Sequence, residues 1–387
     1  MIAYNKEWLD NLYIQKEFAE ACKKKCISME EQNACEEKYP VGFYMPNFFV
    51  RIGLFLLTIV VAIFLFGLIA LMTNLTNSGS FSALLLFFSL IAYGTLEFIV
   101  YVKYHYKSGA DDALIWVTAV FIITAINLYG DISFLQNAGI IFPISLFMTL
   151  RFANMLMSAI ACVSLLAVIF FGYTRLGEMA KATVPFLIML VSAIIYFIIS
   201  RNQFREKLMR YADCLLMIEI ACLFCLYAAG NYYVVREASI SMFQLDLKEG
   251  QGIPFGWLFW IFTVIIPFIY IGRGIQKKDV VLMRSGLILI PVIVFTIRYY
   301  YHILPLETAM IIGGVLMITI CYLLIKYLSK PKHGFTDEEI DNSHLNTAKQ
   351  LESLIIAQTF AQAKIETGNH TEFGGGSGGG GGAGGEF

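Results

Sequence analysis

Long runs of apolar residues, separated by short polar stretches, fill the chain from about residue 50 to residue 327. A helix rises about 1.5 Å per residue, so a run of about 20 apolar residues can cross a hydrocarbon core about 30 Å thick. The pattern therefore predicts ten membrane spans. They are expected at 50–72, 82–102, 112–129, 134–150, 153–173, 183–200, 211–235, 254–272, 285–301 and 306–327. The fourth span is the weakest of them, because it is short and carries Pro143.

The 48 residues before the first span predict a small cytosolic helical hairpin. Trp8, Leu9 and Leu12 recur at helical spacing and would form one apolar stripe. Ser28 followed by Glu31 has the form of a capping box, which would begin a second short helix. We expect this hairpin to lie against the bundle or the membrane surface.

Two further segments are predicted after the membrane bundle, which is assigned to residues 49–328. Residues 329–366 are expected to be cytosolic and helical, with Thr336 and Glu339 as another capping box. Residues 367–387 are rich in glycine and offer almost no apolar surface to bury, which predicts disorder. The tail also has the form of a cloning linker.

Composition supports an all-α, polytopic transmembrane helix bundle. Hydrophobic residues make up 58% of the 387 residues and charged residues 15%, compared with about 25% charged in soluble domains. The lipid bilayer is therefore the first expected partner. The net charge of −1 provides no basic field, so a nucleic-acid partner is not expected.

The distribution of Lys and Arg predicts the orientation of the chain in the membrane. If the N-terminus is cytoplasmic, nearly all basic residues outside the spans fall in segments on the inner side. The outer segments hold only Arg175, Lys181, Arg236 and Lys248. Because basic residues are concentrated on the cytoplasmic side, this asymmetry predicts an even number of spans with both termini cytoplasmic.

Of the residues in the predicted spans, Glu219 has the highest free-energy cost of insertion into the membrane. It lies about 12 Å along the seventh span, slightly short of the middle of the hydrocarbon core. A carboxylate there costs about 2.5–3.5 kcal/mol. It shares a helical face with Cys222 and Gly230, and small residues allow close helix packing, so we expect it to face protein. It would either carry a proton or cation or fix helix packing through hydrogen bonds.

Glu97 and Arg298 complete the set of candidate intramembrane site residues. Glu97 is expected to join a proton or ion path, or else to reach interfacial water or Lys103. Arg298 begins an Arg-Tyr-Tyr-Tyr-His sequence near the end of the ninth span. It would either snorkel outward from an aromatic belt or contact an anion inside the bundle, with Asn127 or Asp131 nearby.

The cysteines and acids show no convincing catalytic or metal-binding pattern. Cys222 and Cys225 form a CxxC pair inside a span, where small residues at a helix contact are the simpler interpretation than thiol exchange. Cys22, Cys26 and Cys35 match no zinc module. Asp111 and Asp112 are interpreted as acids that favour a helix N-terminus. No catalytic residue, metal or cofactor is assigned.

Several sequence segments resemble those of one bacterial family. They are AYNK at 3–6, YPVGFYMPNFFVRIGLF at 39–55, KHGF at 332–335, ESLIIAQTF at 352–360 and the tail FGGGSGGGGGAGGEF. They are similar to a group of uncharacterised multi-span inner-membrane proteins, classed as a domain of unknown function, with a glycine-rich tail that ends in Phe. The resemblance implies a native tail and a bacterial inner membrane, and it implies no activity.

Two functions remain open from the sequence. The first is proton- or ion-coupled transport of a small solute, because acids inside a membrane mark ion and proton paths. The second is a non-catalytic envelope scaffold or sensor, whose cytosolic ends bind a protein partner. An intramembrane enzyme is the weakest of the possibilities. The substrate, the direction of transport and the oligomeric state do not follow from the sequence.

Overall fold

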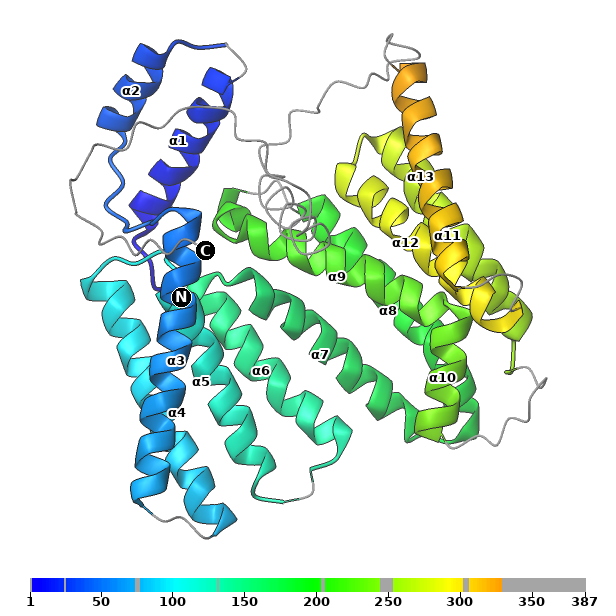
Figure 1. Ribbon diagram of the computed structural model, residues 1–387, viewed down its shortest axis with the longest axis horizontal. Coiled ribbons are helices and arrows are strands. Elements are labelled where there is room, and N and C mark those ends of the chain that lie inside the picture. Colours follow the sequence, from blue (N-terminus) through cyan, green and yellow to red (C-terminus); the bar gives the residue numbers. More distant parts are fainter. Residues whose placement is uncertain are drawn as a thin grey trace, which may run out of the picture. The chain divides into compact units, whose positions relative to one another are not determined.

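The computed structural model describes residues 2–23, 26–73, 77–130, 132–202, 206–243, 253–301 and 306–328. These residues form thirteen α-helices and one short 3-10 helix at Glu206–Tyr211 (Figure 1). The first helices are α1 Lys6–Lys23, α2 Met29–Lys38, α3 Phe48–Met72, α4 Ser78–Val102, α5 Ala110–Asn127, α6 Phe134–Phe152 and α7 Met155–Thr174. They are followed by α8 Glu178–Asn202, α9 Ala212–Gly230, α10 Tyr232–Phe243, α11 Gly256–Lys277, α12 Val280–Tyr301 and α13 Leu306–Leu328.

The predicted all-α membrane bundle is confirmed. Among the described residues, nine helices are long and apolar enough to cross a membrane, namely α3 to α9, α11 and α12. The weak fourth span is present as α6, whose 19 residues reach about 28 Å. The tenth expected span coincides with α13, in which the shorter apolar stretch Ile311–Leu323 is found. The predicted helical segment at 329–366 and the tail at 367–387 lie outside the described residues.

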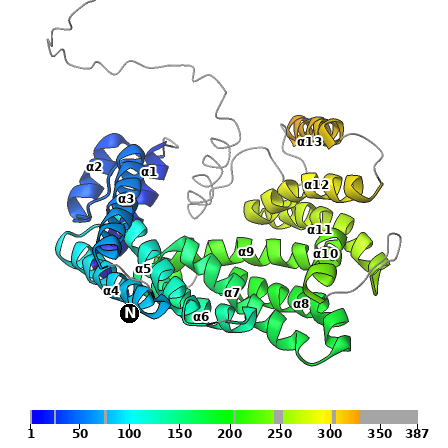
Figure 2. The same ribbon diagram turned by 60° about the horizontal axis from the view of Figure 1, so that its bottom comes forward.

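Helices that follow one another in the sequence pack as neighbours. The closest pairs are α4 with α5, α6 with α7, α8 with α9, and α11 with α12, and short connections join each pair. Helix α7 also packs against α8 and α9, so these three form one group (Figure 2). Helix α9 contacts α11 and α12 as well, which places it among four membrane helices.

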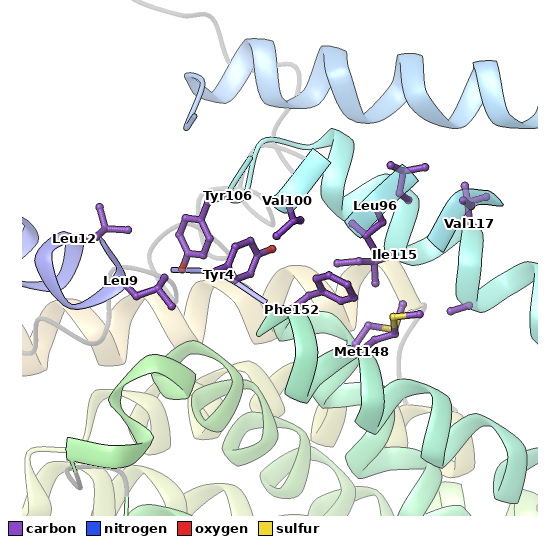
Figure 3. Close-up of a cluster of buried hydrophobic side chains, with 14 residues drawn as sticks. Tyr4, Leu9, Leu12, Leu96, Val100, Tyr106, Ile115, Val117, Met148 and Phe152 are labelled. Carbon is purple, nitrogen blue, oxygen red and sulfur yellow. The ribbon is translucent and has the colours of Figure 1, made fainter. Parts of the chain in front are cut away.

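The N-terminal hairpin packs on the bundle. Ser28 caps α2 through the predicted capping box, with the amide of Glu31 donating to Ser28 Oγ at 3.2 Å. Tyr4, Leu9 and Leu12 are buried in one cluster with side chains from α4 to α7 (Figure 3). Asp10 accepts two hydrogen bonds from Arg210, at 2.7 and 2.9 Å. The alternative that the hairpin contacts only the membrane surface is therefore not the one observed.

The predicted seventh span, 211–235, is correct up to Gly230 and wrong in its last five residues. Helix α9 ends at Gly230, and Asn231 has an extended conformation, with φ −81° and ψ 126°. The Asn231 side chain accepts a hydrogen bond from the amide of Val234 at 3.2 Å, which begins α10. Gly230 also lets Ile266 approach, since a methyl group there would lie 2.8 Å from the Ile266 Cδ1 atom. The apolar pattern continued through this break and concealed it.

A close backbone contact fixes the start of α5. Gly109 has a φ of 92°, a conformation that favours glycine, and a methyl group on it would lie 2.1 Å from the carbonyl oxygen of Arg51. We expect Gly109→Ala to destabilise the protein by about 1–3 kcal/mol, because the backbone strain and the clash act together.

Gly94→Ala is the matched control, because a methyl group there meets nothing within 4 Å in the middle of α4. It should change stability little or raise it slightly. Thermal unfolding of both variants in detergent measures the difference. Equal melting temperatures for the two variants would show that Gly109 lies farther from the carbonyl oxygen of Arg51 than described.

Candidate functional site

Glu219 lies inside the bundle and faces protein, as expected. Its side chain is on α9 and is 2% exposed. Cys222, Leu223 and Tyr227 on the same helix are also buried, which defines the face of α9 that turns away from lipid. That face lies among α7, α8, α11 and α12, so the carboxyl group is shielded from the hydrocarbon by neighbouring helices.

Tyr196 of α8 is a polar side chain in the neighbourhood of Glu219. It lies close enough to both Glu219 and Asp279 to interact electrostatically with each, and its hydroxyl is buried without a hydrogen bond among the described residues. Asp279 precedes α12 and accepts a hydrogen bond from the amide of Leu282 at 3.1 Å. Tyr196 therefore lies near both the buried acid and a loop at the end of the bundle. Sequence reasoning missed Tyr196 and Asp279, because neither residue stands out from its local pattern.

A pair of buried thiols lies one turn beyond Glu219. The sulfur atoms of Cys162 on α7 and Cys222 on α9 are 3.5 Å apart, and both cysteines are free. The sequence pointed to Cys225 as the companion of Cys222 in a CxxC pair. The structure instead brings Cys222 to Cys162, since helices α7 and α9 cross there. These small side chains allow the two helices to approach closely, as the sequence interpretation expected.

Glu97 is in an ion pair that joins two membrane helices. Arg151 at the end of α6 donates from Nε to Glu97 Oε1 at 2.9 Å and from Nη2 to Oε2 at 2.8 Å. The hydroxyl of Tyr93 donates to Oε1 at 2.6 Å. The observed cationic partner of Glu97 is therefore Arg151, 54 positions later in the chain, and not the expected Lys103. The described contacts connect Glu97 with α6 and Glu219 with α8.

Arg298 lies at the aromatic end of α12, where no described contact joins it to Asn127, one of the two partners considered under the anion-contact alternative. Asn127 bonds Asn137 instead, at 3.3 Å, and Asp131 lies outside the described residues. The Nε atom of Arg298 is buried with no hydrogen-bond partner among the described residues. Tyr299 and Tyr300 follow it, with ring centroids 5.1 Å apart. These rings fit the aromatic belt that the sequence predicted.

A buried polar network surrounds the break between α9 and α10. Asn231 is fully buried, and its amide nitrogen donates to Tyr227 at 3.0 Å and to Thr296 of α12 at 3.2 Å. The backbone amide of Tyr232 donates to Thr263 of α11 at 2.9 Å. The backbone amide of Tyr232 thus finds a partner on α11, and the Asn231 side chain links the break to α12. The Gly230-Asn231 dipeptide inside an apolar run was the signal that could have revealed it.

Ion pairs and hydrogen bonds satisfy the charges where the hairpin meets the bundle. Lys107 pairs with Asp213, and Arg51 pairs with Asp112 at 2.6 Å. Asp111 accepts hydrogen bonds from the amide and hydroxyl of Ser108, at 2.9 and 3.0 Å. Both acids therefore hold the start of α5. In the described part of the chain, no three His, Cys, Asp or Glu side chains are placed to hold a metal.

Several groups in this region, outside the spans, have shifted pKa values, and two of them bear on these contacts. Burial alone would lower the pKa of Lys107, but Tyr106 and the carboxylate of Asp213 outweigh it, so the pKa is raised and the amine stays charged. Burial, helped by the nearby carboxylate of Asp111, raises the pKa of Tyr4 well above its ordinary value. At neutral pH Lys107 therefore keeps its ion pair with Asp213, and Tyr4 stays neutral in the cluster that joins the hairpin to the bundle.

The ion pair between Glu97 and Arg151 gives a direct prediction. Arg151→Gln leaves the Glu97 carboxylate without its cationic partner, so stability should fall by about 1–3 kcal/mol. The double variant Glu97→Gln with Arg151→Gln should recover part of that loss, because no uncompensated charge remains. Thermal unfolding in detergent measures both.

Glu178→Gln is the control for loss of an ion pair at an exposed position. Glu178 pairs with Lys181 at 2.7 Å, but its side chain is 80% exposed, so the change should stay within about 0.5 kcal/mol. If Arg151→Gln has no larger effect than Glu178→Gln, the pair between α4 and α6 does not stabilise the bundle.

Comparison with known proteins leaves the family open. The chain matches no family model, no curated protein sequence and no solved structure. The resemblance to bacterial proteins of unknown function is therefore carried by the quoted segments alone. The thirteen helices and nine candidate spans found among the described residues establish that this chain is an integral, multi-span helical membrane protein.

Proposed function

We propose that the protein transports a small solute or an ion across a bacterial inner membrane and couples this movement to protons, with Glu219 as the proton-carrying group. The observation that carries this proposal is the burial of Glu219 among helices, with Tyr196 near both Glu219 and Asp279. Acidic residues buried inside a membrane bundle commonly mark proton and ion pathways.

The interruption of the seventh span is a second support for transport. Discontinuous membrane helices expose backbone groups at the break, and in many secondary transporters these groups bind the substrate or coupling ion. Here the break at Asn231 lies on the helix that also carries Glu219. The break at Asn231 and the acid Glu219 would therefore move together with α9.

We further propose that both termini are cytoplasmic, on the basis of the distribution of Lys and Arg. Alkaline phosphatase and fluorescent-protein fusions after Lys332 and Lys248 test this orientation. Fluorescence without phosphatase activity is expected at Lys332, and phosphatase activity is expected at Lys248. Phosphatase activity at Lys332 would contradict the proposed topology.

The role of Glu219 is tested by complementation of a deletion strain. Its growth phenotype and metabolite profile are first measured, and the strain is then supplied with wild-type protein, Glu219→Gln or Glu219→Asp at matched expression. Gln keeps the shape and hydrogen bonding of Glu but cannot carry a proton, so it should leave the deletion phenotype. Asp should restore function in part.

Tyr196→Phe is the companion variant, because it removes only the hydroxyl between Glu219 and Asp279. It should weaken complementation while the protein accumulates normally.

Full complementation by Glu219→Gln would contradict the proton-carrying role and leave Glu219 as a packing group.

A scaffold that binds a cytosolic protein is the second candidate function, and one observation favours it. The outward face of α2 carries Glu30, Glu31, Glu36 and Glu37, all exposed, while α1 contributes the contacts to the bundle. An acidic face on a docked hairpin could bind a basic partner. Under this alternative, changing the four acids to Gln would reproduce the deletion phenotype and Glu219→Gln would be silent.

A further inference from the structure

A cavity of about 430 Å³ opens between α4, α5 and α6, away from Glu219. Its size is within the range of small-molecule sites. Its walls are mainly apolar and come from all three helices, and they include Ser89, Tyr93, Thr118, Ile122, Pro143 and Phe147. All three helices are candidate membrane spans, so the cavity lies within the hydrocarbon layer.

The cavity opens toward lipid rather than toward water. Leu90 and Phe147 line it and are 68% and 40% exposed, so they mark a rim on the outside of the bundle. One wall is fixed by the ion pair described above, because the Tyr93 hydroxyl donates to Glu97, which is held by Arg151. A ligand would therefore enter sideways from the bilayer.

Among the described residues that line the cavity, Thr118 supplies the one polar side-chain atom that is fully buried without a hydrogen-bond partner. Its side chain is 1% exposed, and its hydroxyl is buried without a hydrogen bond among the described residues. A buried hydroxyl without a partner is costly, which indicates that an acceptor from outside the chain completes it. A ligand with a hydrogen-bond acceptor at this point would accept a hydrogen bond from the Thr118 hydroxyl.

The depth of Thr118 decides which ligand fits. It lies about 12 Å from the first residue of α5 and about 14 Å from the last, near the middle of the span. The ester carbonyls of phospholipids lie at the interface, whereas only apolar chains reach the middle of a core about 30 Å thick. The acceptor must therefore belong to a molecule that dissolves in the hydrocarbon itself.

We propose that this cavity binds an isoprenoid quinone. The flat ring would lie against the aromatic and thioether side chains of Tyr93, Phe147 and Met148. One ring carbonyl would accept the hydrogen bond from Thr118, and the isoprenoid tail would leave past Leu90 into the bilayer. This binding site is separate from the proposed proton-carrying site and does not depend on transport.

The test is binding of radiolabelled decylubiquinone to the full chain in detergent. Wild-type protein should bind it saturably. Thr118→Val keeps the shape of the side chain but removes the hydroxyl, so Kd should rise about three- to tenfold. Thr118→Ser should keep the wild-type affinity, and it preserves the test if the Val variant folds poorly.

Two further variants locate the site. Thr124→Val removes a hydroxyl from an exposed position on the same helix and should leave Kd unchanged. Leu90→Trp adds bulk at the exposed rim, where folding should tolerate it, and should reduce binding.

Three results would overturn the proposal. The first is absence of saturable binding to the wild-type protein. The second is an equal Kd for Thr118→Val and wild type, which would place the quinone elsewhere. The third is equal displacement of the label by decylbenzene, which has the ring and chain but no carbonyl, because the cavity would then be a groove for lipid tails.

Discussion

The bilayer offers no water to polar groups, so every charged or hydrogen-bonding group within it must find a partner in the protein. Three features of this structure follow from that constraint. Glu219 turns into the centre of four helices, Glu97 is held by Arg151 from another helix, and Asn231 and the amide of Tyr232 link the break to α12 and α11. The arrangement of the helices in each region follows from where these groups must be.

The two intramembrane acids differ in what surrounds them. The charge of Glu97 is compensated by a two-point contact with Arg151, which suits a fixed structural connection between α4 and α6. Glu219 instead is almost fully buried on α9, and Tyr196 and Cys222 are among the residues near it. Acids buried at such positions inside a membrane bundle mark proton and ion pathways. This difference in burial is why the proposed function rests on Glu219 rather than on Glu97.

The sequence predicted what depends on local pattern and missed what depends on long-range pairing. Apolar run lengths identified the membrane helices, the Ser28 and Glu31 spacing identified the cap of α2, and the cost of an exposed acid placed Glu219 inside. The partner of Glu97 was missed because Arg151 is distant in sequence and adjacent only after folding. The break at Asn231 was missed because the apolar run continues on both sides of it.

The central claim is that Glu219 exchanges a proton inside the bundle, and infrared difference spectroscopy tests it most directly. The carbonyl stretch of a protonated carboxylic acid in an apolar site is measured during a pH titration of wild-type protein and of Glu219→Gln. The account predicts a band that disappears and returns reversibly with pH in the wild type and is absent from the variant. A Glu219 band that stays unchanged across the titration would contradict it, because the acid would then be a fixed part of the packing.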